Sequence, residues 1–226
     1  MKRPTVLVSL ALVATAGLVA VTGIDRREAS SPAAEVPPVA ATPSESQFDD
    51  VSRATGIPRR ALQAYVSAAQ TIARETPGCG IAWNTIAGIG SSESSHGAFG
   101  GASLDDGGVA RPLIIGVPLD GTNGNRAIRD TDGGVLDSDI TWDRAVGPMQ
   151  FIPTTWQMWG ADGDGDGERR PHDLDDAALA AGRYLCDAGD DLSASDGWSK
   201  AVLTYNNSGS YARKIARTAA DYADQT

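Results

Sequence analysis

Glu93 is the residue of this sequence that is best placed to do acid–base chemistry. It follows an apolar stripe in which Ala82, Ile86 and Ile89 are spaced at i, i+4 and i+7, and it falls on the same stripe at i+11. Burial on such a face disfavours the charged carboxylate and raises its pKa, which suits a general acid. From this stretch alone, a glutamate at a frayed helix end that points to solvent is an equal alternative.

A second candidate site is an acidic, glycine-containing loop whose spacing matches an EF-hand calcium loop. Oxygen ligands must converge on a hard cation there, and Gly167 at position 6 would allow the sharp turn. The predicted calcium ligands at positions 1, 3, 5, 7 and 12 are Asp162, Asp164, Asp166, Glu168 (through its backbone carbonyl) and Asp173. Position 12 is Asp rather than Glu, and position 8 is Arg169 rather than an apolar residue. We therefore expect a lone structural calcium site, with a solvated acidic turn as the alternative.

Two further stretches place polar groups in apolar surroundings. Gln150 follows a Gly-Pro turn within residues 145–156, and it is either a recognition group or a satisfied core amide. Tyr205 and Asn206 lie between two predicted helices, where a core tyrosine and a helix C-cap are the simplest interpretation. Neither stretch on its own shows whether its polar residues are structural or bind a ligand.

Helical periodicity indicates a mainly α domain that positions these residues. The predicted helices cover residues 58–75, 81–95, 153–159, 174–188, 198–205 and 210–222. The acidic loop therefore lies between two helices, which is the context that an EF-hand loop requires.

Residues 97–144 show little periodicity and contain many glycine turn signals. Loops longer than about 12–15 residues inside a compact domain are usually functional or disordered. Pro112 and Pro118 argue against a strong central strand, although a small hairpin is compatible with them. We expect an ordered Gly/Asp-rich flap beside the active site, with disorder as the alternative.

The N-terminus has the pattern of an export signal. Two basic residues precede an apolar run over residues 6–24, and this pattern predicts a signal peptide. The run is nearly long enough to cross a bilayer, so an uncleaved membrane anchor is the alternative at residues 1–24. Residues 25–50 are rich in Pro, Ala and Ser and predict a disordered tether, which leaves residues 51–226 as the folded domain.

Charge and cysteine content restrict the class of function. The 226-residue chain has a net charge of −10 and no visible basic face for phosphates, so we expect no nucleic acid partner. In an exported chain, Cys79 and Cys186 are expected to form a disulfide rather than remain two free buried thiols. Closing a loop of about a hundred residues stabilises the fold by roughly 4–5 kcal/mol in the chain-entropy model. Two cysteines and two histidines argue against a zinc site.

Together, four stretches occur in the order found in soluble-lytic-transglycosylase-like proteins. The chain most closely resembles the membrane-bound lytic murein transglycosylase B type, in the form found in exported actinobacterial proteins, over roughly residues 56–222. The stretches that carry the resemblance are Glu93-Ser94-Ser95-His96-Gly97, Gly147-Pro148-Met149-Gln150-Phe151-Ile152-Pro153, the acidic loop from Asp162 to Asp173, and Tyr205-Asn206. The calcium loop directly after the Gln-Phe-Pro segment is the most specific of them.

The resemblance implies a mainly α, lysozyme-like fold of the goose-type or soluble lytic transglycosylase kind, acting on the glycan strands of peptidoglycan. It implies that Glu93 is the only catalytic carboxylate. The substrate-binding residues that we expect are Ser94, Gln150, Phe151, Tyr205 and Asn206. In this arrangement Tyr205 would hydrogen-bond the Glu93 carboxyl. We expect a monomer that works outside the cytoplasm, secreted or anchored at the cell envelope.

The implied reaction explains how one carboxylate can be enough. Ordinary glycosidases use two acids, one to protonate the leaving oxygen and one as nucleophile or water-activating base. In a lytic transglycosylase, Glu93 would protonate the bridging oxygen and then accept the proton of the muramoyl 6-hydroxyl, which closes onto C1 as a 1,6-anhydro end. The alternatives are a hydrolytic muramidase with a loop aspartate, and a non-catalytic, calcium-stabilised glycan-binding protein. The loop candidates for a second acid are Asp105, Asp106, Asp132 and Asp137.

Overall fold

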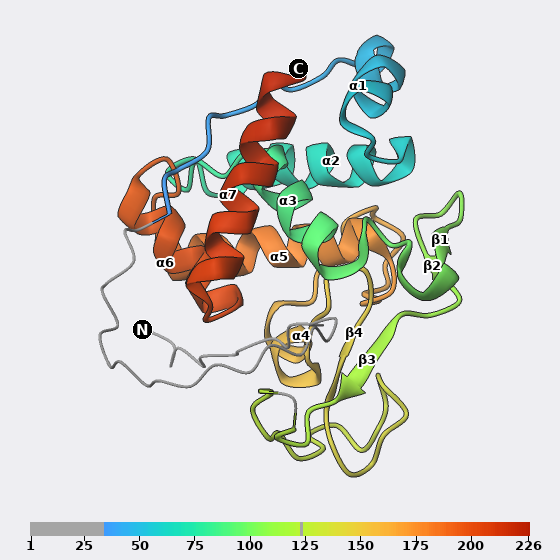
Figure 1. Ribbon diagram of the computed structural model, residues 1–226. Helices are drawn as coiled ribbons and strands as arrows, with labels where there is room; N and C mark the ends of the chain where they lie inside the picture. The colour runs from blue at the N-terminus through green and yellow to red at the C-terminus, as the bar shows by residue number, and fades with distance from the viewer. Residues whose placement is uncertain (1–33, 123) are drawn as a thin grey trace, which may run out of the picture.

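The computed structural model describes residues 34–122 and 124–226, and seven α-helices in this part of the chain build a largely helical body (Figure 1). They are α1 (Phe48–Thr55), α2 (Arg59–Glu75), α3 (Trp83–Ser94), α4 (Pro153–Trp159), α5 (Leu174–Gly189), α6 (Ser195–Tyr205) and α7 (Gly209–Asp224), with two short 3-10 helices, η1 (Glu45–Gln47) and η2 (Phe99–Gly101). The predicted mainly α architecture is confirmed, and every predicted helix is present with small shifts at its ends. Helix α1 was not predicted.

Helix α5 is central to the core because its small residues let neighbouring helices approach closely. Residues 177–182 on this helix are all buried, and five of the six are alanine or glycine. A Cβ atom on Gly182 would lie 2.1 Å from Cδ1 of Ile72, so the Ile72 side chain of α2 packs directly against the backbone of α5 at this glycine. Helices α2 and α6 both pack on α5, which holds the chain after the acidic loop in a fixed position.

Helices α3 and α7 pack side by side in opposite directions (Figure 1). Near the start of α3, Nδ2 of Asn84 donates to the carbonyl oxygen of Ala219 at 2.8 Å. One turn further along α3, Gly88 lies against Ile215, which is earlier in α7. Because the two helices are antiparallel, the end of α3 that carries Glu93 faces the start of α7.

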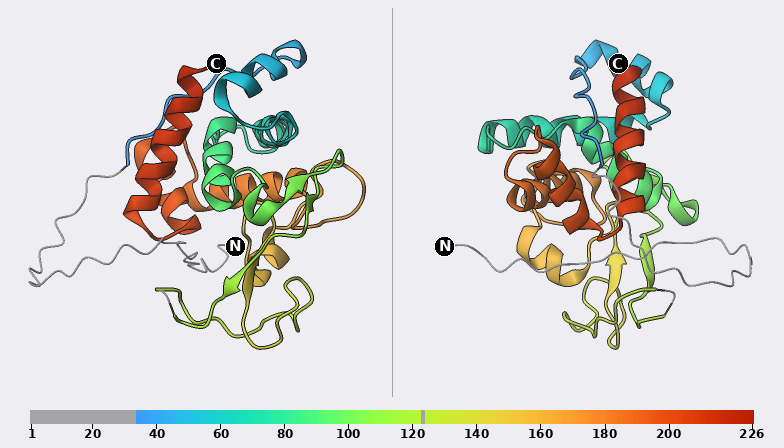
Figure 2. Two further views of the ribbon diagram at one scale, coloured as in Figure 1. Left: turned by 45° about the vertical axis from the view of Figure 1, so that its right-hand side comes forward. Right: turned by 60° about the vertical axis from the view of Figure 1, so that its left-hand side comes forward.

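Two small antiparallel sheets lie within residues 103–146. Strand β1 (Ser103–Leu104) pairs with β2 (Ala110–Arg111), and β3 (Ile115–Pro118) pairs with β4 (Arg144–Val146). The β3–β4 part projects below the helical body in Figure 1, and Figure 2 shows it from two other sides. Between β3 and β4, several aspartate side chains accept hydrogen bonds from nearby backbone N–H groups: Asp130, Asp132, Asp137, Asp139 and Asp143. These bonds satisfy backbone groups in a segment with little regular secondary structure.

The predicted disulfide is present. Cys79, in the loop before α3, is bonded to Cys186 in the second half of α5, and their Cα atoms are 5.4 Å apart. The carbonyl oxygen of Cys79 also accepts a hydrogen bond from the N–H of Leu192 at 2.7 Å. The start of α3 is therefore fixed to the end of α5 by a covalent bond and by backbone pairing.

Residues 34–44 lie against the helices, which differs from the disordered tether expected over residues 25–50. Side chains of the folded body donate hydrogen bonds to their backbone carbonyls. These bonds run from Asn84 Nδ2 to Pro38 (2.9 Å), from Trp83 Nε1 to Ala41 (3.0 Å) and from Ser199 Oγ to Ala34 (3.1 Å). Composition did not reveal this, because the donors belong to distant helices and the extended segment contributes mainly its backbone.

Within residues 34–122 and 124–226, no helix is both long and apolar enough to cross a bilayer. The predicted signal peptide or anchor at residues 1–24 lies outside the described residues.

Candidate active site

Glu93 lies in the last turn of α3 and borders a cleft of about 690 Å³. Ile86 and Ile89 on the preceding turns are fully buried, so the apolar stripe predicted from the sequence does lead to this carboxylate. The Glu93 residue itself is partly buried. The helix thus holds the carboxyl at the boundary between the core and the cleft.

The hydroxyl of Tyr211, in the first turn of α7, donates a hydrogen bond to Oε1 of Glu93 at 2.5 Å. Burial raises the pKa of Glu93 to about 7, and the Tyr211 hydrogen bond and the charge of Lys214 oppose this rise. Burial and the nearby Glu93 raise the pKa of Tyr211 well above its usual value, so its hydroxyl stays protonated. A carboxyl with a pKa near 7 can both give and take a proton at neutral pH.

Tyr205 does not make the predicted hydrogen bond to Glu93. Its hydroxyl donates instead to the carbonyl oxygen of Met149 at 2.7 Å, and the residue is 3% exposed. Tyr211 rather than Tyr205 reaches Glu93 because of helix packing. Tyr205 ends α6, whereas Tyr211 is on α7, the helix that packs along α3. The sequence offers no local signal for this choice, because the packing of α7 along α3 is a long-range contact.

Ser94 joins the end of α3 to the Gly-Pro turn. Its Oγ donates to the carbonyl oxygen of Pro148 at 2.6 Å and accepts from the N–H of Gly97 at 2.8 Å. The predicted substrate-binding residue is therefore buried and engaged with backbone, although it also borders the cleft. Its bonds place Glu93 next to the turn that carries Gln150.

Gln150 borders the cleft in the left-handed backbone region, with φ of 50°. Its Nε2 donates to the carbonyl oxygen of Gly147 at 2.9 Å. A Cβ atom on Gly116 would lie 3.0 Å from Oε1 of Gln150, so the bare glycine of β3 leaves room for the amide. The side chain is thus held by the turn itself at the cleft wall.

The remaining two predicted binding residues differ in their access to the cleft. Asn206 borders it, directly after α6. Phe151 is 2% exposed, and its ring packs edge-on against Trp156 and Tyr205 with centroid separations of 5.4 and 6.0 Å. The ring of Phe151 supports the cleft from within the core, where a sugar cannot reach it.

The cleft has an apolar side and a basic side. The apolar residues that line it are Phe99, Ile115, Val117, Leu119 and Ala145. The basic residues are Arg144, Lys214 and Arg217. Among the described residues that line this cleft, Glu93 is the one acid, so none of the loop aspartates proposed as a second acid borders it. The geometry therefore favours chemistry that uses a single carboxyl.

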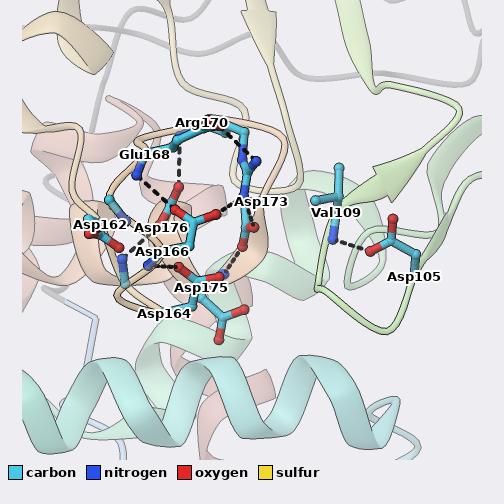
Figure 3. A network of polar contacts seen from close by, with 12 residues as sticks. Asp105, Val109, Asp162, Asp164, Asp166, Glu168, Arg170, Asp173, Asp175 and Asp176 are labelled. Atoms are coloured by element: carbon cyan, nitrogen blue, oxygen red, sulfur yellow. Dashed lines mark hydrogen bonds and ion pairs between the residues drawn. The ribbon is translucent and has the colours of Figure 1, made fainter.

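The acidic loop brings together a slightly different set of carboxylates from the predicted one (Figure 3). Oxygens of Asp162, Asp164 and Asp176 all lie within 4.8 Å of one another. Asp173, predicted at position 12, is instead the N-cap of α5 and accepts from the N–H of Asp175 at 3.0 Å. Asp176, in the first turn of α5, is the third acid of this group.

The other two predicted ligands pair with Arg170. Oδ2 of Asp166 contacts Nη2 of Arg170, and Oε2 of Glu168 is 2.9 Å from Nη1 (Figure 3). The predicted ligand atom of Glu168 is its backbone carbonyl oxygen. The contact of its side chain with Arg170 does not involve that atom.

The donor chemistry of the loop fits a calcium ion. The grouped atoms are all hard carboxylate oxygens, which suit calcium rather than a softer metal. The Oδ2 atom of buried Asp173 has no hydrogen-bond partner among the described residues, although Nη2 of Arg170 is 3.6 Å away. Burial and neighbouring acids raise the pKa of both Asp173 and Asp176 to about 6, which reflects crowding that a bound cation would relieve.

A second acidic group lies in the loop between β3 and β4, and the sequence reasoning did not single it out. Oxygens of Asp130, Asp132 and Asp143 also lie within 4.8 Å of one another. Asp143 is fully buried and accepts hydrogen bonds from the backbone and side chain of Thr131. The hydrogen bonds of this group account for the local loop structure.

Part of the chain is similar to a known protein family. Residues 135–191 match the family model described as Transglycosylase SLT domain. The matched segment contains β4, the turn with Gln150, α4, the acidic loop and α5, whereas Glu93 and Tyr211 lie outside it. No curated protein and no solved structure matches the chain. The match shows that this segment is similar to transglycosylase SLT domains.

Proposed function

We propose that this chain is a lytic transglycosylase of the membrane-bound lytic murein transglycosylase B type that cleaves peptidoglycan glycan strands. The observation that carries the proposal is a cleft in which Glu93 is the one acid among the described lining residues. Its carboxyl has a pKa of about 7 and accepts a hydrogen bond from Tyr211. The family match of residues 135–191 supports the same substrate class. The disulfide and the predicted export signal support a site of action outside the cytoplasm.

In the first step, protonated Glu93 donates its proton to the oxygen that joins N-acetylmuramic acid to N-acetylglucosamine. The bond between that oxygen and C1 of the muramoyl residue breaks, and C1 becomes electron-deficient. The polar side chains of Gln150 and Asn206 border the same cleft and orient the 2-acetamido group that supports C1. The Tyr211 hydroxyl stabilises the carboxylate left on Glu93.

In the second step, the Glu93 carboxylate accepts the proton of the muramoyl 6-hydroxyl. Oxygen 6 forms a bond to C1, and the carboxyl returns to its starting state. No water is consumed, so a second carboxylate is not needed to activate one. A pKa near 7 serves both steps, because neither the acid nor the base form is strongly disfavoured at neutral pH.

The experiment is a digest of purified glycan strands with the wild type and with Glu93→Gln. The proposal predicts 1,6-anhydro ends, one water lower in mass than reducing ends, and a loss of at least about a thousandfold in rate for the variant. Reducing ends would identify a muramidase instead. Undiminished cleavage by Glu93→Gln would remove Glu93 from the mechanism.

We also propose that the acidic loop holds a structural calcium ion, with Asp162, Asp164 and Asp176 as side-chain ligands. The convergence of their oxygens and the unpartnered Oδ2 of Asp173 support this assignment. The ion would connect the end of α4 to the start of α5 and so support the turn that carries Gln150. It has no part in the proton transfers.

A further inference from the structure

The first turns of α7 give the cleft a basic edge. Lys214 and Arg217 both line the cleft and are both exposed, in a chain whose net charge is −10. They follow Tyr211 at successive spacings of three residues, so all three lie along one side of the helix. The edge therefore starts at the residue that holds Glu93 and extends away from it.

These two cations are not used to hold the protein together by ion pairs. Within the described part of the chain, neither Lys214 nor Arg217 has a carboxylate within ion-pair distance. Nζ of Lys214 donates to Oγ of Ser92 at 3.1 Å, which places the ammonium group beside the last turn of α3. Their positive charges are available to a ligand in the cleft.

The third cation of the cleft is different. Nε of Arg144 is 2.9 Å from Oδ2 of Asp139, and its Nη1 donates to the carbonyl oxygen of Gly116 at 3.1 Å. Arg144 is thus neutralised and holds β3 to β4. The excess positive charge of the cleft is concentrated on α7.

The sugars of a glycan strand offer hydroxyl and acetamido groups. These groups are uncharged, so binding them does not require cations such as Lys214 and Arg217. The negative charges of peptidoglycan are carboxylates, and most of them belong to the peptide stems attached to the lactyl group of each muramoyl residue. We infer that Lys214 and Arg217 bind stem-peptide carboxylates, so that the cleft selects glycan that still carries its peptides. This inference rests on the proposed function, because it takes peptidoglycan as the ligand of the cleft.

The spacing of the edge is consistent with a stem that leaves the sugar near the scissile bond. Three residues of α-helix correspond to about 4.5 Å of rise, so Arg217 is displaced by about 9 Å along α7 from Tyr211. A carboxylate near the sugar would meet Lys214, and one further along the stem would meet Arg217. The guanidinium of Arg217 can bind a carboxylate through two parallel hydrogen bonds.

The test measures binding of soluble, uncrosslinked glycan strands by calorimetry, using the full chain with Glu93→Gln to prevent turnover. The strands are compared with a preparation whose carboxylates have been converted to amides. We expect Lys214→Gln with Arg217→Gln to weaken binding of native strands about tenfold and to leave binding of amidated strands unchanged. Arg213→Gln is the matched control, because this exposed cation is on the same helix but does not line the cleft, and it should have no effect.

Equal loss of affinity for native and amidated strands would overturn the inference, and so would unchanged affinity for native strands. A second test uses the single variant Arg217→Gln in the protein that keeps Glu93. The KM of this variant for native strands should rise, because a contact with the strand is lost. Its kcat should be kept, because Arg217 is not among the groups that set the pKa of Glu93. The proposed function fails separately, through the absence of anhydro ends in digests by the wild type. The binding comparison does not depend on cleavage, so the two failures are distinguishable.

Discussion

The hydroxyl of Tyr211 donates to Oε1 of Glu93 at 2.5 Å, across 118 residues of sequence. This contact connects the last turn of α3 to the first turn of α7 and places a proton donor on a carboxyl whose pKa burial has raised to about 7. The hydrogen bond favours the carboxylate form, so it limits the rise that burial causes.

Replacing Tyr211 by Phe should raise the pKa of Glu93 further, because the opposing hydrogen bond is lost and burial stays. The activity that depends on protonated Glu93 should then persist to higher pH than in the wild type. We expect kcat at neutral pH to fall about tenfold, since a hydrogen bond to a charged group is worth roughly 1.5–3 kcal/mol. A pH profile of kcat checks this, and an alkaline limb that stays in place or moves to lower pH would contradict it.

Glu93 should make the folded protein less stable as the pH rises. The pKa of Glu93 in the folded protein is about 7, which is above its usual value. At pH values between these two pKa values, the folded state binds more protons than the unfolded state. The free energy of unfolding therefore falls as the pH increases. Glu93→Gln removes this titration. The melting temperature of the variant should therefore exceed that of the wild type by a margin that grows from about pH 5 to about pH 8. A constant margin across that range would show that Glu93 titrates normally in the fold.

Removal of calcium should lower the melting temperature. A ligand at a hundredfold excess over its Kd stabilises by about 2.7 kcal/mol, which corresponds to roughly 5–10 °C for a chain of this size. Asp176→Asn should abolish the response to a chelator, whereas Asp187→Asn, at an exposed position on the same helix, should keep it. An unchanged melting temperature of the wild type in chelator would exclude a structural calcium ion.

Loss of the disulfide should cost stability without changing the chemistry. Cys79 and Cys186 close a loop with a sequence separation of 107 residues, for which the chain-entropy model gives roughly 4–5 kcal/mol. Denaturant unfolding of the double variant Cys79→Ser with Cys186→Ser measures this loss. A reductant should bring the wild type to the same stability and leave the double variant unaffected; if the reductant also destabilised the double variant, the effect would not come from this bond.

The helical part of the fold and the place of Glu93 could be predicted because both depend on local periodicity. The apolar residues of α3 indicate a buried helix, and residues 83–90 are all buried, with Glu93 in the turn that follows them. The choice between Tyr205 and Tyr211 as the partner of Glu93 could not be made in this way. It depends on which of two neighbouring helices packs along α3, and this is a long-range contact.

The acidic loop shows a similar limit. The regular spacing of Asp162 and Asp164 predicted a cation site, but the spacing alone does not show which acid of the following helix lies beside them. Oδ1 of Asp173 caps α5, and Asp176 in the first turn of that helix lies beside Asp162 and Asp164. The packing of residues 34–44 against the helices could not be predicted for another reason. Their backbone carbonyls accept hydrogen bonds from distant side chains, and such contacts leave no pattern in the composition of the segment.

The measurement that tests the central claim most directly is digestion of purified glycan strands in water enriched in oxygen-18, followed by mass spectrometry of the new ends. If Glu93 acts first as acid and then as base toward the muramoyl 6-hydroxyl, the ends formed by the wild type are 1,6-anhydro sugars without the heavy isotope. Reducing ends that carry oxygen-18 would show that water attacks C1, and the single-carboxylate mechanism would be wrong.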